Sequence, residues 1–146
     1  MPDVVVVGVD GSPHGWLALE WAVREATLRG ATLKIVCAFE DPVTSVGLGT
    51  AFGTGAPIAV DPTLIEGAAK DIATEAAKRA GDVPVEVVAR CDRPEDVLCE
   101  ESKGAAMLVV GSRGHGAVGS LLLGSVSNYV VHHASCPIVI VPPTTA

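Results

Sequence analysis

The stretch VVVVGVDGSP, from Val4 to Pro13, decides the fold class. Its first part, up to Val9, is a run of β-branched residues typical of a strand that is buried on both faces. Its last part is a helix start, with Ser12 at the N-cap and Pro13 at the first helical position. A strand of this kind suits a parallel sheet that carries helices on both faces.

The order of elements along the rest of the chain supports this interpretation. Strands are expected at residues 4–9, 32–39, 83–89, 106–110 and 137–141. Helices are expected to start at Pro13, Pro62, Pro94 and Ser125 and to end near Gly30, Gly81, Gly104 and Ala134. With right-handed crossovers, this alternation predicts an α/β fold with a doubly wound parallel sheet of five strands.

The faces that the first two helices turn to the core are expected from their apolar residues. The first helix presents Leu17, Trp21 and Leu28, with the alanines between them, and the second presents Leu64, Ile65, Ala68 and Ile72. No repeat of 20–50 residues is found, so residues 1–146 are expected to form one domain. Residues 42–60 are rich in Gly, Thr and Pro, and we interpret them as a flexible connection, either a lid or a disordered loop.

Composition restricts the class of partner. The chain has 146 residues, of which 49% are hydrophobic and only 3% aromatic, so its core must be aliphatic. Its formal net charge of −7 argues against nucleic acid or an anionic membrane as a partner. Any phosphate must therefore be bound by backbone N–H groups and a few local cations.

The cysteines and the N-terminal sequence indicate in which cellular compartment the protein is expected. Cys37, Cys91, Cys99 and Cys136 have no metal-ligand spacing and are expected to be buried, reduced thiols, which fits a cytoplasmic protein. No basic region precedes the first apolar run, so neither a signal peptide nor a membrane anchor is expected. No apolar stretch approaches the ~18 residues that a membrane-spanning helix needs.

Two nucleotide motifs match the glycine-rich loop after the fourth strand only superficially. Gly114, Gly116 and Gly119 form a G-x-G-x-x-G, but the dinucleotide motif follows the first strand and needs an acidic residue about 20 positions later. No acid follows Gly119. A P-loop requires Lys directly after its second glycine, whereas Ala117 follows Gly116. Both interpretations are rejected.

The remaining pattern predicts an anion site at the switch point of the sheet. Ligands of such sheets bind beyond the carboxyl ends of the strands, where the strand order reverses. If the first and fourth strands are neighbours, the loop Asp10–Ser12 meets the loop that begins at Gly111. That second loop leads to Gly124 and Ser125 at the start of the fourth helix, whose N–H groups and dipole favour phosphate. The hydroxyls of Ser125 and Ser127 are further donors, and Arg113 and His115 are the potential cations.

The spacing Gly111-x-x-Gly114-x₉-Gly124-Ser125, with VVGVDGS near the start and CPIVIV near the end, resembles the universal stress protein family. The resemblance extends from Val4 to Val141, and the glycine spacing is typical of the ATP-binding, single-domain bacterial members. It implies a Rossmann-like sheet, of the adenine nucleotide alpha hydrolase-like type, ordered 3-2-1-4-5. It also implies a cytoplasmic homodimer in which the last strand, Pro137 to Val141, pairs with its twin.

The resemblance further implies which residues would bind ATP, with or without Mg²⁺. Gly8, Asp10 and Ser12 would lie at the adenosine, and Ala38 would line the adenine pocket. The residues that would surround the phosphates and ribose are Gly111, Ser112, Arg113, Gly114, His115, Gly116, Ala117, Gly124, Ser125, Val126 and Ser127. Two positions depart from the family pattern, since His115 stands where a basic residue is common and Ala106 where Asp is often found.

Several of these residues also have purely structural explanations. Asp10 would cap the first helix together with Ser12, and the glycines would serve only as turn residues. His132 and His133 suit the end of a helix, where cations complement the dipole. Trp16 and Trp21 are expected to pack in the core, and His14 is expected to face solvent. Asp92, Glu95 and Asp96 are interpreted as an acidic helix start.

Three functions remain open at this point. The first is an ATP-binding regulator of a stress response in which nucleotide occupancy controls a conformation or a partner. The second is a slow ATPase or phosphotransferase, although no side chain in the loops is clearly placed as a base. The third is a nucleotide-free dimerisation or interaction module.

Overall fold

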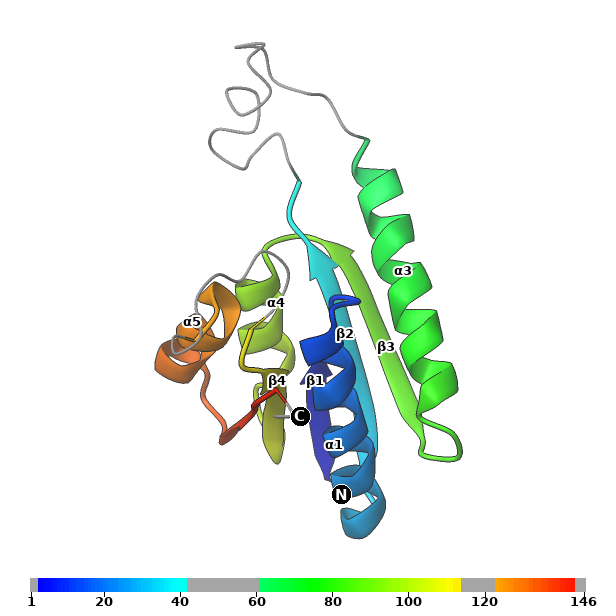
Figure 1. The fold of residues 1–146 in the computed structure, drawn as a ribbon, viewed down its shortest axis with the longest axis vertical. Helices are drawn as coiled ribbons and strands as arrows, with labels where there is room; N and C mark the ends of the chain where they lie inside the picture. Colours follow the sequence, from blue (N-terminus) through cyan, green and yellow to red (C-terminus); the bar gives the residue numbers. More distant parts are fainter. Residues whose placement is uncertain (1–2, 42–60, 114–122, 144–146) are drawn as a thin grey trace.

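The computed structural model describes residues 3–41, 61–113 and 123–143, and within them it contains one parallel sheet between two layers of helices (Figure 1). The strands are β1 (Val4–Gly8), β2 (Thr32–Phe39), β3 (Val85–Cys91), β4 (Met107–Gly111) and β5 (Ile138–Val141). The helices are α1 (Pro13–Arg29), α3 (Pro62–Arg79), α4 (Pro94–Glu101) and α5 (Ser125–His133). The strand order is β3-β2-β1-β4-β5, so the predicted fold class and strand order are confirmed.

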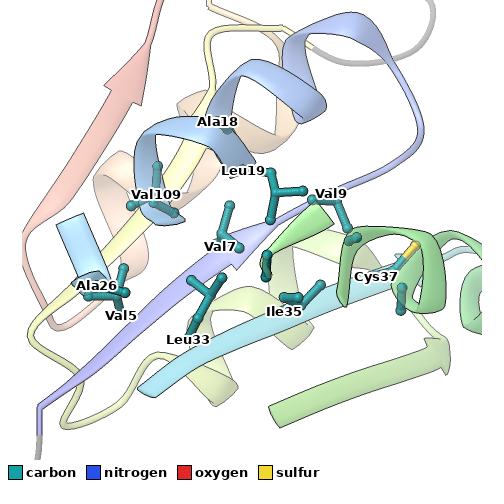
Figure 2. Packing of buried hydrophobic residues seen from close by; sticks show 14 of the residues in the cluster. Val5, Val7, Val9, Ala18, Leu19, Ala26, Leu33, Ile35, Cys37 and Val109 are labelled. Carbon is teal, nitrogen blue, oxygen red and sulfur yellow. The ribbon is translucent and has the colours of Figure 1, made fainter. Parts of the chain in front are cut away.

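Each face of the sheet has its own core. Val5 and Val7 of β1 point toward α1 and α3, whereas Val6, between them, points to the side of α4 and α5. All three are fully buried, as expected for a central strand covered on both faces. Figure 2 shows the core on the side of α1 and α3, where Leu19 of α1 packs over the β1 valines.

The buried face of α1 agrees with the prediction in its alanines but not in its larger residues. The residues buried on this helix are Gly15, Ala18, Leu19, Ala22 and Ala26. Leu28 is 83% exposed, and Leu17 and Trp21 are only half-buried. Small residues toward the sheet let the helix axis approach the strands closely, so the larger apolar side chains are displaced to the flanks of the helix.

On α3, too, small residues occupy the buried face and larger apolar residues do not. Ala69, Ala73 and Ala76 form its buried stripe, whereas Leu64 is 69% exposed and Ala68 is also exposed. Only Ile65 and Ile72 of the predicted face are half-buried. In both helices the alanine spacing, rather than the largest apolar side chains, marks the face that packs on the sheet.

The boundaries of β3 are shifted by two residues from the prediction. The carbonyl of Pro84 accepts from Leu33 N at 2.8 Å, but the paired register begins with Leu33 opposite Val85. The register continues to Phe39 opposite Cys91, which extends the strand past Ala89. The predicted connection at residues 42–60 lies outside the described residues. No helix in the described ranges is long and apolar enough to cross a membrane.

Candidate functional site

The site that the sequence indicates lies at the carboxyl ends of β1 and β4. β1 pairs with β2 on one edge and with β4 on the other, so the strand order reverses between β1 and β4. The chain leaves β1 toward α1 on one face and leaves β4 toward α5 on the opposite face. This is the topological switch point at which doubly wound sheets bind their ligands.

The loop after β1 is organised around Asp10. Its Oδ1 accepts hydrogen bonds from Ser12 N, at 2.9 Å, and from Ser12 Oγ. Ser12 Oγ in turn accepts from Gly15 N at 3.2 Å and so forms the N-cap of α1. Gly11 has φ 82°, a left-handed conformation that suits glycine. This carboxylate oxygen therefore supports Ser12, whose own hydroxyl caps α1, and the contact of Asp10 with a ligand stays a prediction.

Gly111, at the end of β4, lies against the first turn of α1. A Cβ at this position would be 2.8 Å from His14 O and 3.0 Å from both His14 C and His14 Cβ. Glycine here allows the helix backbone to rest directly on the strand end, a reason for its presence that the sequence did not show. His14 is consequently half-buried, and the prediction that it faces solvent was wrong.

The start of α5 is tied to the end of β4 through one carbonyl group. Ser112 O accepts from Gly124 N at 2.8 Å and from the buried Ser127 Oγ at 3.0 Å. Ser127 Oγ also lies 3.0 Å from Gly124 O. Ser112 N donates to Val141 O, so the same residue continues the pairing with β5. We call Ser112, Gly124 and Ser127 the β4–α5 clamp, because it fixes where the helix N-terminus lies relative to the sheet.

Small residues lie at the ends of β1 and β2 on the side of the sheet that faces α4. A Cβ on Gly8 would lie 3.1 Å from both Cδ atoms of Leu98. Ala38, at the end of β2, is 5% exposed and belongs to the same core. Gly8 and Ala38 thus keep β1 and β2 close to α4, which is the part of the site where the adenine was predicted.

The remaining predicted site residues are distributed as follows. Arg113 is half-buried directly after the clamp residue Ser112, Ser125 is exposed, and Val126 is half-buried. Gly114, His115, Gly116 and Ala117 lie outside the described residues. The clamp therefore places the two ends of the predicted phosphate loop side by side, and the roles of its individual residues stay predictions.

Cys37 lies on β2 and is fully buried in the core beneath α1 and α3. Burial, and secondarily the negative charge of Asp10, raise the pKa of its thiol to about 12 from an ordinary 9.0. All four cysteines are free thiols, but only Cys37 is buried, whereas Cys91, Cys99 and Cys136 are half-buried. Partial burial also raises the pKa of Cys91 and Cys99. Cys37 is thus held protonated as part of the core.

The residues given structural interpretations behave largely as expected. His132 Nδ1 and His133 Nδ1 each lie 2.8 Å from the carbonyl four residues earlier. Glu95 and Asp96 occupy the first turn of α4, where the Arg93 guanidinium lies 2.8 Å from the former and 3.6 Å from the latter. Trp16 packs partly buried against the core, beneath the Arg79 guanidinium at 3.9 Å from the ring centroid. Among residues 3–41, 61–113 and 123–143, no cluster of three His, Cys, Asp or Glu side chains is arranged for a metal ion.

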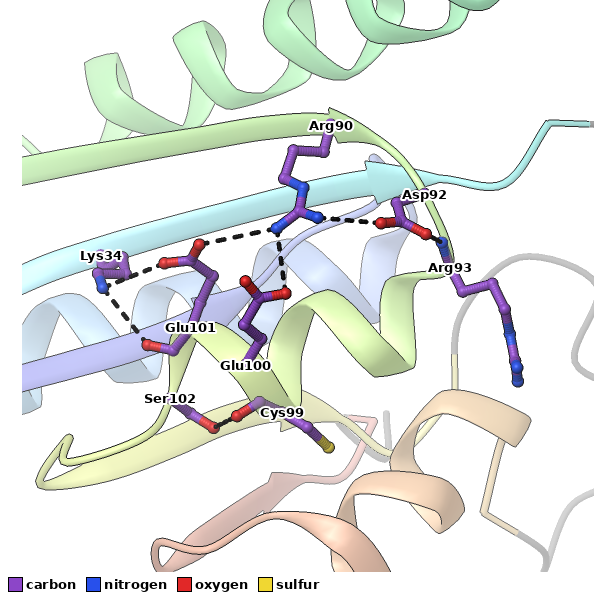
Figure 3. A network of polar contacts seen from close by, with 8 residues as sticks. All are labelled: Lys34, Arg90, Asp92, Arg93, Cys99, Glu100, Glu101 and Ser102. Carbon is purple, nitrogen blue, oxygen red and sulfur yellow. Dashed lines mark hydrogen bonds and ion pairs between the residues drawn. The ribbon is translucent and has the colours of Figure 1, made fainter.

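A polar network that sequence reasoning missed connects β2, β3 and α4 (Figure 3). Lys34 Nζ lies 3.3 Å from Glu101 Oε2, and the Arg90 guanidinium contacts Glu100 at 3.4 Å and Asp92 at 3.0 Å. Apart from the pair of Arg90 and Asp92, these contacts join residues distant in sequence, so no local pattern could have indicated the network. The network fixes α4 on the sheet behind the site.

Comparison with known protein families shows to which family the chain belongs. The sequence model of the universal stress protein family matches residues 1–142. The chain belongs to the universal stress protein family. Among the curated members of this family, a universal stress protein of Mycobacterium bovis is 40% identical over 136 residues. The match covers 93% of this chain and 44% of that protein, so the chain spans less than half the length of this relative.

Solved structures of the family share the fold. A universal stress protein in complex with cAMP is 28% identical, with a TM-score of 0.63 and 98% of both chains covered. A universal stress protein from Archaeoglobus fulgidus, in complex with dAMP, is 19% identical with a TM-score of 0.61. That match covers 96% of this chain and 97% of the other. Adenine nucleotides are thus found bound to family members that share this fold.

Proposed function

We propose that this chain binds ATP at the crevice between the ends of β1 and β4 and acts as a nucleotide-dependent regulator in a stress response. The observation that carries the proposal is the convergence of the Asp10 loop and the β4–α5 clamp at the switch point. The adenine nucleotides in the two family structures support it.

The N-terminus of α5 is the part of the site best suited to the phosphates. Gly124 is its N-cap and supplies no side-chain cap, and no acidic residue occupies the first turn. The first N–H groups of a helix have no partner within the helix, so they and the helix dipole favour an anion. In this proposal Ser125, Val126 and Ser127 close on the phosphates, Arg113 adds positive charge, and any Mg²⁺ is held mainly by the phosphates.

The nucleoside would occupy the other half of the crevice. Gly8 ends β1 and Asp10 follows it, whereas Ala38 lies near the end of β2, which pairs with the edge of β1 opposite β4. A nucleotide that spans both halves would place adenine near β2 and its phosphates near α5.

Titration calorimetry with Mg-ATP tests the proposal, with Gly124→Glu as the key variant. The new carboxylate would stand at the anion-binding helix end, so binding should be lost. Gly67→Glu is the matched control, because Gly67 lies in α3 with nothing within 4 Å of the added Cβ. Retained binding in Gly124→Glu, or no wild-type binding below millimolar ATP, would refute the proposal.

Mass spectrometry of acid-released small molecules separates the alternatives. Copurified ATP supports the regulator. ADP, together with turnover that Asp10→Ala abolishes, supports the slow ATPase or phosphotransferase. An empty site together with negative calorimetry supports a nucleotide-free interaction module.

We also propose a homodimer formed through the last strand, in the cytoplasm. β5 is an edge strand, and the carbonyls of Pro137 and Val141 accept from Leu108 N of β4 and from Ser112 N just after it. Alternation along the strand then turns the N–H of Ile140 to the open edge. Ile140→Pro should therefore yield a monomer by analytical ultracentrifugation without losing a β4 bond. An unchanged sedimentation coefficient would exclude pairing through this edge. The four free thiols suit a reducing compartment.

A further inference from the structure

His14 is fixed beside the start of the predicted phosphate loop. Its carbonyl oxygen, carbonyl carbon and Cβ all lie within 3.0 Å of the Cβ position of Gly111. Ser112 follows Gly111 directly and holds the start of α5 through its carbonyl. The first turn of α1 therefore contributes a side chain beside the end of β4.

The imidazole of His14 carries a buried nitrogen without a hydrogen-bond partner. His14 Nδ1 and Ser112 Oγ are the two buried side-chain polar atoms in the described part of the chain that have none. Buried polar atoms are nearly always paired, so an unpaired one indicates a missing ligand, ion or water. The contrast with His132 and His133 is informative, because each of these bonds Nδ1 to the preceding turn of its helix. His14 is the second residue of α1, where no preceding turn exists.

The charge around these two atoms favours an anionic partner. Neither α1 nor α5 has an acidic residue in its first turn, although the chain carries a net charge of −7. Both helix dipoles present their positive ends here. The carboxylate of the adjacent loop, on Asp10, accepts hydrogen bonds from Ser12.

We propose that His14 is a further residue of the nucleotide site and donates a hydrogen bond from Nδ1 to a phosphate oxygen of the bound nucleotide. This inference rests on the proposed nucleotide binding and adds a contact from α1. Nδ1 carries a proton in one of the two neutral tautomers and in the imidazolium, so it can donate this bond in either of those two forms.

The test compares ATP with adenosine in titration calorimetry. His14→Leu removes the donor at similar volume and should weaken ATP binding about tenfold or more, as expected for a bond to a charged group. Adenosine has no phosphate, so its affinity should not change. His14→Asn places an amide near the position of Nδ1 and should restore most of the ATP affinity. His132→Leu, on the exposed end of α5, should leave both affinities unchanged.

Stability of the nucleotide-free protein gives a second readout. His14→Leu breaks no hydrogen bond that Nδ1 makes in the described structure, so its urea midpoint should equal or exceed that of the wild type. The ¹⁵N chemical shift of His14 Nδ1 in the wild type should also move when ATP, but not adenosine, is added.

Three results would overturn the inference. Wild-type ATP affinity in His14→Leu would remove His14 from the site while leaving the proposed function intact. Equal losses for ATP and adenosine would exclude a phosphate contact. Absence of ATP binding in the wild type would remove both the proposed function and this inference. If His14→Leu does not fold, the ¹⁵N shift of the wild type still decides, because it should move with ATP and not with adenosine.

Discussion

Replacing Gly111 by alanine should destabilise the protein, because the added Cβ meets backbone atoms that cannot rotate away. The new methyl group would lie 2.8 Å from His14 O and 3.0 Å from His14 C. Comfortable contacts of carbon lie at about 3.5–4.0 Å, so the first turn of α1 would have to move by about 0.5–1 Å. Overpacking of this kind costs about 1–3 kcal/mol. In a chain of this length that lowers Tm by about 2–4 °C per kcal/mol.

Two other glycines provide matched controls for the same substitution. In Gly8→Ala the Cβ would lie 3.1 Å from the two Cδ atoms of Leu98, which are the far ends of a flexible side chain, so the cost should be smaller. Gly67 lies within α3 with nothing within 4 Å, and Gly67→Ala should stabilise by up to about 1 kcal/mol through helix propensity.

Urea unfolding followed by circular dichroism measures all three variants. The expected order of stability is Gly67→Ala, wild type, Gly8→Ala and then Gly111→Ala. A Gly111→Ala variant as stable as the wild type would show that α1 does not rest on β4 as described.

Three further predictions concern the neighbourhood of the site. Ser12→Ala removes the N-cap of α1 and should lower the free energy of unfolding by about 1 kcal/mol, whereas Ser12→Thr should retain most of it. The folded pKa of Cys37 is raised to about 12, so its contribution to stability is complete below the unfolded thiol pKa and is lost as pH rises from about 9 toward 12. Unfolding of Cys37→Ala should therefore show a shallower alkaline decline than the wild type, and parallel curves would contradict the assignment. Arg79→Ala removes the cation above Trp16, which should shift the tryptophan emission and cost about 0.5–1 kcal/mol, and an unchanged spectrum would exclude the contact.

The architecture was predictable because the residues that start and end its helices form local sequence signals. Ser12–Pro13 and Asp61–Pro62 mark the starts of two helices. Gly30 and Gly81, both with positive φ, mark where these helices end. Strand boundaries were less certain because pairing decides them, as at β3, where the register with β2 extends the strand to Cys91. Several of the larger residues predicted for the buried helix faces were misplaced because hydropathy ranks leucine above alanine, whereas close packing on a sheet favours alanine.

The site was predictable only to the level of its two loops. The glycines and serines after β1 and β4 identify them, and the topology brings them together. The contact of Gly111 with His14, and the bond from Ser127 Oγ to Ser112 O, join residues that no local pattern relates. The unpaired Nδ1 of His14 is likewise a property of packing, since two other histidines of this chain pair the same atom.

The strand order also has a consequence for how the chain folds during synthesis. β1, β2 and β3 are consecutive in sequence and neighbours in the sheet, so this half needs only nearby pairings. β4 must then pair with β1, placing Met107 opposite Val5 across most of the chain. Until β4 leaves the ribosome, one edge of the valine-rich central strand stays open to other chains. Long-range pairings of this kind are slow and expose such edges to aggregation. We therefore expect nascent chains that end before residue 107 to need chaperone protection more than the completed sheet does.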